Sequence, residues 1–251
     1  MSDRPRIEVV GHGGAGAYFP GNSRPAIQRA LAIGVDRIEC DVQRTSDGVL
    51  VLGHDESVLI DGVKLALRGL GLETLRLGAA DMLTLDEHLE LVGDRSDFLL
   101  DMKAPGYEDA LADAIRRHGI AERTIVSSTY ALGLRHLRRL VPGLSTGLSS
   151  GHLASGIPVE IVRTLLGAAL GWLSPSPLVL AARRIGADAL MVQHRVCSPR
   201  MVARAHEAGL RVYPWTVDDE DRMDRLIGMG IDGIISNKPD VLKSHLLEAT
   251  T

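Results

Sequence analysis

The stretch 37–55 carries two acidic side chains and a histidine at a spacing that suits chemistry. Glu39 and Asp41 are one residue apart in an apolar run, so alternation along a strand places both carboxylates on one face. Carboxylates held side by side repel each other unless a cation or a proton lies between them. A second apolar run, 49–53, delivers His54 at its end. The stretch predicts a cation site beside a proton-transfer group; a solvated edge strand is the structural alternative.

Two further apolar runs end in groups of the same kind. One run ends at His12 before a glycine-rich segment, and another leads into Asp101, which shares a strand face with Lys103. Three carboxylates without a thiol suit a hard divalent cation, Mg²⁺ or Ca²⁺. Two histidines suit general acid and base catalysis near neutrality, and a lysine beside the cation suits an anion. This set predicts phosphoryl transfer, although Asp101 and Lys103 are also compatible with a simple ion pair.

The elements that must position these groups alternate along the chain. Apolar runs typical of strands are followed by amphipathic segments typical of helices about eight times. One helix start is predicted with Asn22 or Ser23 as the N-cap, and another at Thr84, with Glu87 completing a capping box. In 251 residues this alternation predicts a single-domain (β/α)₈ TIM barrel, with an open doubly wound sheet as the alternative.

Barrel active sites form at the carboxyl ends of the strands, and the chemistry-bearing residues fall there. Trp215 and His194 also follow predicted strands and are candidates for lining the pocket. Histidines within predicted helices are expected to be solvated; these are His88, His118, His136, His206 and His245.

The composition excludes several other classes. A hydrophobic fraction of 45% and a formal net charge of −4 are typical of an ordinary globular protein. The chain lacks the excess of basic residues that would indicate nucleic-acid binding. The sequence contains no run of about 20 apolar residues, so no membrane span is predicted. Residues 1–10 lack the apolar core of a secretory signal. Two cysteines form neither a disulfide framework nor a C-x-x-C zinc motif, which favours a cytoplasmic location.

Two segments interrupt the regular alternation. The connection 56–80 mixes leucines with glycines and charges and is interpreted as a short insertion, so that 1–251 form one domain. The apolar segment 165–173 is interpreted as an ordinary barrel helix. A sharper hypothesis makes it a flap over the barrel mouth that accommodates an acyl chain and favours a lysophospholipid substrate.

Taken in order, the motifs resemble the glycerophosphodiester phosphodiesterase family over nearly the whole chain. The family pattern consists of H-R-G, P-E-N-T, E-x-D, H-D, E-x-K, W-T and G-x-D-G. It is met here by His12-Gly13-Gly14, Pro20-Gly21-Asn22-Ser23, Glu39-Cys40-Asp41, His54-Asp55, Asp101-Met102-Lys103, Trp215-Thr216 and Gly230-Ile231-Asp232-Gly233.

The resemblance implies a TIM barrel that binds a divalent metal, Mg²⁺ or Ca²⁺, and cleaves glycerophosphodiesters into glycerol 3-phosphate and an alcohol. It implies that His12 and His54 act as acid and base, that Lys103 steadies the phosphate and that Trp215 walls the pocket. The implied metal ligands are Glu39, Asp41 and Asp101.

The chain departs from the family pattern at two glycines and at Asp101, which replaces a glutamate and keeps a carboxylate on a side chain one methylene shorter. Gly13 replaces the usual arginine, which would grip phosphate with two hydrogen bonds, and Gly21 replaces a glutamate. Arg24, Arg44 and Arg195 are candidates to supply the missing cation. Two rival functions therefore stay open: a phospholipase D-like enzyme acting on lysophospholipid or sphingomyelin, and a non-catalytic binder of metal and polyol phosphate.

Overall fold

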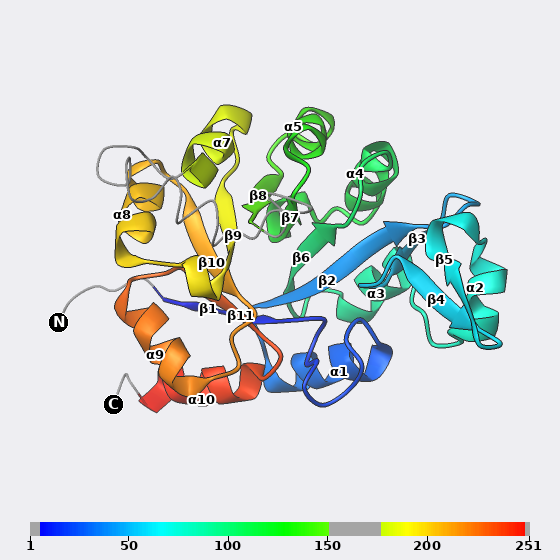
Figure 1. Ribbon diagram of the computed structural model, residues 1–251, viewed down its shortest axis with the longest axis horizontal. Coiled ribbons are helices and arrows are strands. Elements are labelled where there is room, and N and C mark those ends of the chain that lie inside the picture. The colour runs from blue at the N-terminus through cyan, green and yellow to red at the C-terminus, as the bar shows by residue number, and fades with distance from the viewer. Residues whose placement is uncertain (1–5, 151–176, 249–251) are drawn as a thin grey trace.

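The computed structural model describes residues 6–150 and 177–248, and eight parallel strands in this part of the chain form a nearly closed barrel (Figure 1). Hydrogen-bonded ladders join them in the order β11-β1-β2-β6-β7-β8-β9-β10. Their bounds are β1 Glu8–Gly11, β2 Arg37–Arg44, β6 Asp97–Met102, β7 Thr124–Ser128, β8 Ser145–Ser149, β9 Ala189–Gln193, β10 Arg211–Trp215 and β11 Gly233–Ser236. Backbone hydrogen bonds from Asp232 to Val212 and from Val217 to Ile235 connect the two ends of this row. The predicted (β/α)₈ barrel is confirmed.

Helices follow the barrel strands and cover the outside of the sheet (Figure 1). Their bounds are α1 Arg24–Ile33, α3 Leu85–Val92, α4 Glu108–Arg117, α5 Ala131–Leu140, α7 Pro177–Ile185, α8 Pro199–Glu207, α9 Glu220–Gly228 and α10 Pro239–Glu248. The Ser23 hydroxyl accepts a hydrogen bond from the Ala26 amide, and Thr84 and Glu87 form the reciprocal capping box. Both helix starts therefore lie where their capping residues predict them.

Alternation along each strand divides the apolar core into two layers. On β6, Leu99 packs inside the barrel with Val10 and Met191, whereas Leu100 packs between the barrel and its helices. On β2 the outward-facing positions are equally apolar, and Cys40 is fully buried among them. The inward positions of β2 are therefore the ones that hold its acidic residues.

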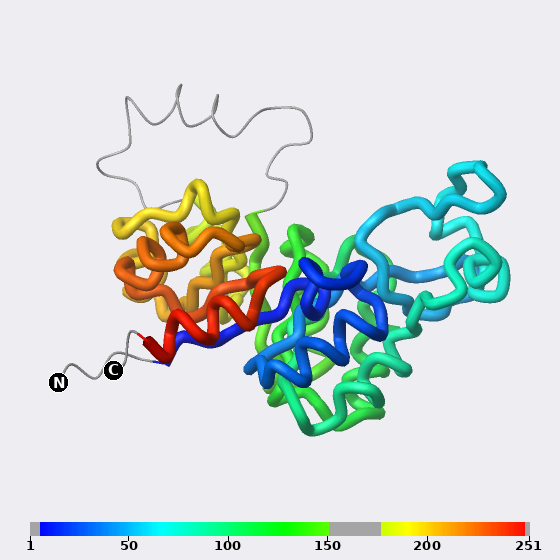
Figure 2. The backbone as a smooth tube through the Cα atoms, turned by 90° about the horizontal axis from the view of Figure 1, so that it is seen from below, coloured from blue at the N-terminus to red at the C-terminus, as the bar shows by residue number. Residues whose placement is uncertain are grey.

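The segment after β2 forms a hairpin and a small projecting unit. The strand β3 (Leu50–Leu52) pairs antiparallel with β2, so it is not a strand of the parallel barrel. The apolar run before His54 is thus a strand, as expected, but it returns antiparallel to β2. The projecting unit comprises β4 (Ser57–Ile60), β5 (Val63–Ala66), a short 3₁₀ turn η1 (Leu67–Gly69) and α2 (Leu72–Gly78) (Figure 2). A small apolar cluster of Val51, Leu67 and Leu75 fixes this unit to the hairpin.

Three expectations about individual segments also have outcomes. The expectation that His88 is solvated is wrong, because its side chain is fully buried on the inner stripe of α3. The segment 165–173, with its flap hypothesis, lies outside the described residues. Within residues 6–150 and 177–248, no helix combines the length and apolar character that crossing a bilayer requires.

Candidate active site

Three carboxylates meet at the carboxyl ends of two adjacent strands. Asp41 on β2 pairs in register with Asp101 on β6, and Glu39 lies one inward position deeper on β2. One oxygen from each carboxylate lies within 4.8 Å of the others. The period of two that placed Glu39 and Asp41 on one face has thus placed both in the barrel interior, where Asp101 joins them.

Lys103 lies between two of these carboxylates. Its Nζ is 2.9 Å from Asp41 Oδ1 and 3.1 Å from Asp101 Oδ2. Ser127 on β7 donates a hydrogen bond of 2.7 Å to the other Asp101 oxygen. Asp101 and Lys103, which were predicted to share a strand face, therefore form an ion pair in the mouth of the barrel.

Two parts of the connection between β1 and α1 also hold the acidic side chains. The Gly13 amide donates a hydrogen bond of 2.9 Å to Glu39 Oε2. Asn22 donates from Nδ2 to Asp41 Oδ2 at 2.7 Å, and Asn22 Oδ1 accepts from the Asp41 amide at 2.9 Å. Both parts belong to the segment 12–23 between β1 and α1, so the glycine-rich segment and the P-G-N-S motif orient the carboxylates.

The electrostatics of the cluster show an excess of negative charge. Burial, followed by the charges of Asp41 and Asp101, raises the pKa of Glu39 well above its usual value. Burial also raises the pKa of Asp101, an effect that Lys103 offsets in part. Burial acts in the same direction on Asp41, but Lys103 and Asn22 outweigh it and lower its pKa. One ammonium therefore does not neutralise three carboxylates.

His12 and His54 face the same groove from different elements. His12 Nδ1 lies 2.7 Å from Asn237 Oδ1, and its Nε2 lies 3.9 Å from Glu39 Oε2. His54 Nδ1 lies 2.9 Å from Asp55 Oδ1 and is largely exposed. The antiparallel return of β3 brings His54 back to the barrel mouth, where Gln43 donates to two backbone carbonyls of the segment 53–55.

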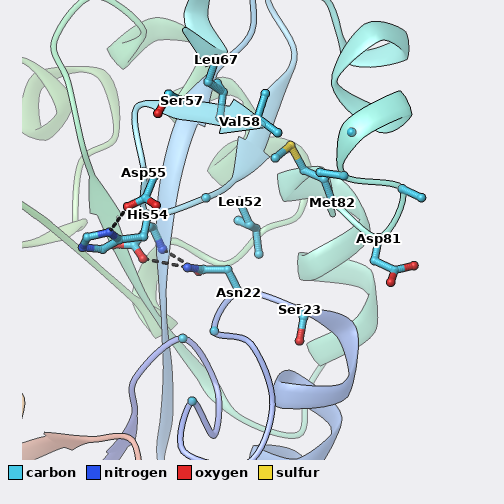
Figure 3. Close-up of a pocket in the computed structure, with 18 of the residues that line it drawn as sticks. Asn22, Ser23, Leu52, His54, Asp55, Ser57, Val58, Leu67, Asp81 and Met82 are labelled. Atoms are coloured by element: carbon cyan, nitrogen blue, oxygen red, sulfur yellow. Dashed lines mark hydrogen bonds and ion pairs between the residues drawn. The ribbon is translucent and has the colours of Figure 1, made fainter. Parts of the chain in front are cut away.

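The groove extends from these histidines toward the projecting unit and has a volume of about 660 Å³. Figure 3 shows Asn22 and Ser23 on one side and Leu52, Val58, Leu67 and Met82 toward the other. The end near His12 is thus polar, whereas the far end is lined mainly by apolar side chains. Such a gradient suits a substrate with a charged centre and a less polar substituent.

Other candidate residues lie away from this groove. Trp215, the last residue of β10, packs against the apolar side chains inside the barrel, which include Val10, Leu99 and Met191. His194 lies in a 3₁₀ turn after β9, where burial and the charges of Arg222 and Arg195 lower its pKa. Neither is among the described residues that line the groove, so their pocket-lining roles stay predictions.

The missing phosphate-binding arginine has no clear replacement at the groove. Among the described residues that line it, none is an arginine, so Arg24, Arg44 and Arg195 gain no support. Gly13 has a φ of +53°, and a Cβ there would meet Gly21 Cα at 2.9 Å. The two glycines that depart from the family pattern therefore pack against each other.

Some residues around the site carry no motif signal. Asn237 after β11 bonds to His12, and Asp218 after β10 accepts hydrogen bonds from the Asn237 amide and side chain. These two polar loop residues are distant from His12 in the sequence. Their position after predicted barrel strands was the only available signal.

Fold and site together define a (β/α)₈ barrel enzyme with an acidic, histidine-flanked centre at the carboxyl ends of its strands. The model of the glycerophosphoryl diester phosphodiesterase family matches residues 12–118 and 102–241. A glycerophosphodiester phosphodiesterase of Caldanaerobacter subterraneus is 30% identical over 93% of this chain and 95% of its own length. The chain belongs to the glycerophosphoryl diester phosphodiesterase family, and is thereby a phosphoric diester hydrolase.

Solved structures show the same fold. A glycerophosphodiester phosphodiesterase from Parabacteroides distasonis aligns with a TM-score of 0.79 at 21% identity, over 99% of this chain and 100% of its own. An Oleispira antarctica phosphodiesterase, solved in complex with the product sn-glycerol-3-phosphate, aligns with a TM-score of 0.78 at 20% identity, over 95% of this chain and 96% of its own.

Proposed function

We propose that this chain hydrolyses glycerophosphodiesters to glycerol 3-phosphate and an alcohol, using a divalent cation held by Glu39, Asp41 and Asp101. The observation that carries the proposal is the carboxylate cluster in the barrel mouth, whose member Asp41 lines the same groove as His12 and His54. The product complex of the Oleispira relative supports glycerol phosphate as the recognised moiety.

The donor set fits a hard divalent cation. All three candidate ligands offer carboxylate oxygens, which Mg²⁺ and Ca²⁺ prefer, and no thiol belongs to the cluster. Burial and the charges of Asp41 and Asp101 raise the pKa of Glu39, so its ionised form is unfavourable without a further cation beside Lys103. A bound cation would supply Lewis-acid stabilisation of charge on the phosphoryl oxygens.

The two histidines are suited to complementary proton transfers. Each binds its Nδ1 partner, Asn237 for His12 and Asp55 for His54, which leaves each Nε2 available for substrate. Cleavage of the phosphodiester requires one group to take the proton of the attacking oxygen and another to protonate the leaving alkoxide. We assign these two tasks to His12 and His54.

Phosphate binding would rely on Lys103 and the cation in the absence of an arginine at position 13. The Lys103 side chain lies beside the carboxylate cluster and keeps a relative accessibility of 24%. The charges and hydrogen bonds of Asp101 and Asp41 outweigh burial and raise its pKa, so it remains an ammonium at neutral pH. It can therefore contact an anion without losing its own charge.

The test compares turnover of glycerophosphocholine by EDTA-treated protein with and without added Mg²⁺ or Ca²⁺, in wild type, His12→Ala and Asp101→Asn. We expect metal-restored release of glycerol 3-phosphate in the wild type and its loss in both variants. Folded, metal-loaded protein that releases no product would contradict the proposal.

The rival functions receive less support. Family membership favours an enzyme over a non-catalytic binder. The lysophospholipid hypothesis depended on the segment 165–173, which lies outside the described residues, so it stays a prediction. A cytoplasmic location remains part of the proposal and is supported by Cys40 and Cys197, both buried free thiols.

A further inference from the structure

A chain of hydrogen bonds links His12 to two polar residues in other loops of the barrel mouth. His12 follows β1, Asn237 follows β11 and Asp218 follows β10, so the three residues occupy the carboxyl ends of three neighbouring strands. His12 Nδ1 lies 2.7 Å from Asn237 Oδ1, and Asn237 Nδ2 lies 2.7 Å from Asp218 Oδ2. Of its three members, His12 and Asn237 line the substrate groove.

The Asp218 carboxylate sets the direction of every hydrogen bond in this chain. An ionised carboxylate only accepts, and Asp218 accepts from Ser236 Oγ at 3.0 Å, the Asn237 amide at 2.8 Å and Asn237 Nδ2. The Asn237 side chain must therefore turn its NH₂ toward Asp218 and its oxygen toward His12. Because an amide oxygen also only accepts, Nδ1 of His12 must carry a hydrogen.

The glycine-rich loop is shaped around the same oxygen. A Cβ on Gly16 would lie 2.7 Å from Asn237 Oδ1, so a larger residue would occupy the space that this oxygen fills. The Ala17 amide also donates to the Asn237 backbone carbonyl at 3.1 Å. The loop that carries His12 therefore also contacts Asn237 through Gly16 and Ala17, in addition to the hydrogen bond between His12 and Asn237.

We propose that Asp218 and Asn237 are positioning residues that hold neutral His12 in the Nδ1–H tautomer, so that the lone pair of its Nε2 faces the groove. A neutral imidazole has one donor and one acceptor nitrogen, and the partner of one nitrogen decides the role of the other. His12 is thereby prepared to accept a proton at Nε2, the nitrogen that lies 3.9 Å from Glu39 Oε2. The catalytic consequence rests on the proposed function, whereas the tautomer does not.

The first test is the tautomer itself, read from two-bond ¹H–¹⁵N correlations of the imidazoles in ¹⁵N-labelled protein with Mg²⁺, at about pH 8.5, where an unperturbed imidazole is neutral. His12 is assigned as the spin system missing from His12→Gln. We expect a protonated Nδ1 and a bare Nε2. A protonated Nε2 in the wild type would overturn the proposal without any variant.

The second test is Asp218→Asn, which keeps the shape of the side chain but replaces one acceptor oxygen with a donor NH₂. The Asn237 amide and Ser236 still require the remaining oxygen, so the new NH₂ faces the Asn237 side chain and should reverse its amide. His12 Nδ1 then meets a donor and must accept. We expect the Nε2–H tautomer and a fall in kcat of about tenfold or more with little change in KM.

The matched control is Asp219→Asn, which removes the same charge one residue away. Asp219 caps α9 by accepting from the Arg222 amide, and asparagine can serve the same role. We expect the control to keep the Nδ1–H tautomer and the wild-type kcat. If Asp218→Asn keeps the tautomer, the proposal is wrong, whatever its activity. Lack of turnover in wild type with the expected tautomer would count only against the proposed function.

Discussion

Asn22 and Asp41 exchange two hydrogen bonds across the barrel mouth, one from each residue to the other. The Asn22 side chain donates to Asp41 Oδ2 at 2.7 Å, while the Asp41 backbone amide donates to Asn22 Oδ1 at 2.9 Å. Asn22 is buried and has a φ of +66°, in the left-handed region that asparagine tolerates better than most residues. The pair fixes one oxygen of Asp41 and leaves the other to Lys103, at 2.9 Å.

Asn22→Ala and Asn22→Gly separate the two roles of this residue. Both remove the hydrogen bonds to Asp41, so both should weaken metal-restored turnover, by roughly tenfold or more. Only alanine suffers from the left-handed backbone, so Asn22→Ala should be less stable than Asn22→Gly by about 1 kcal/mol. Turnover assays and urea unfolding measure the two effects. Equal turnover in Asn22→Gly and wild type would show that the pair does not orient the carboxylate.

The sequence predicted the position of a site residue correctly where the local pattern of the strand or helix determines which way its side chain points. Glu39 and Asp41 were placed correctly because the period of two along a strand is a local property. The run before His54 was correctly predicted to be a strand. Parallel and antiparallel strands can have the same apolar pattern, so the antiparallel pairing of this strand with β2 was not predictable. Asn237 is 225 residues from His12, and only the tertiary fold brings the two together.

His88 shows a local signal that pointed the other way. It lies on the same face of α3 as Leu85, Leu89 and Val92, at the spacing of a helical apolar stripe, and all four are buried. Residue type suggested a solvated side chain, but position in the stripe decides burial. The periodicity alone would have placed His88 correctly.

Lys103→Met should destabilise the metal-free protein more than the metal-loaded protein. Lys103 is the cation that compensates Asp41 and Asp101, so without it the carboxylates repel, at a cost on the order of 2–3 kcal/mol. A divalent cation would compensate the same charges. Thermal unfolding in EDTA and in excess Mg²⁺ should show a larger stabilisation by Mg²⁺ in the variant than in wild type. The same Mg²⁺ effect in both proteins would contradict a shared site.

Glu39→Gln should exchange activity for stability. The Glu39 carboxylate is buried beside two other carboxylates, and burial and their charges raise its pKa well above its usual value. Removing that charge should stabilise the metal-free protein by about 1 kcal/mol, while the loss of a metal ligand lowers turnover by about 100-fold. Urea unfolding in EDTA and initial rates with Mg²⁺ test the pair of effects. Glu39→Asp, which keeps the charge, should show the loss of turnover without the gain in stability.

His88 should make the protein less stable as the pH falls from 7 to 5. Burial lowers the pKa of His88 from its usual 6.5 to about 4, and both ring nitrogens lack hydrogen-bond partners. Between these values the unfolded chain binds a proton and the folded protein does not. The free energy of unfolding should therefore fall by about 2 kcal/mol over this range because of this residue.

The comparison of wild type with His88→Leu in urea, at pH 7 and pH 5 with EDTA present, isolates that contribution from the carboxylates. The fall in unfolding free energy should be smaller in the variant by the same amount. His136→Gln removes a half-exposed helical histidine, with a relative side-chain accessibility of 47%, and should follow the wild type. A parallel pH dependence in His88→Leu and wild type would show that His88 takes up its proton in the folded protein.

Gly13→Arg restores the residue usual in the family but should not improve the enzyme. The backbone of Gly13 has a φ of +53°, and a Cβ would lie 2.9 Å from Gly21 Cα and 3.0 Å from the Asn22 nitrogen. The side chain would therefore push apart the two parts of the β1–α1 connection that hold Glu39 and Asp41. We expect a loss of about 2 kcal/mol in stability, together with lower turnover. Gly21→Ala is the matched control, because a Cβ there meets Gly13 Cα at 3.7 Å, an ordinary contact. A Gly13→Arg protein of wild-type stability with faster turnover would show that the two parts of this connection can separate and that phosphate binding limits the enzyme.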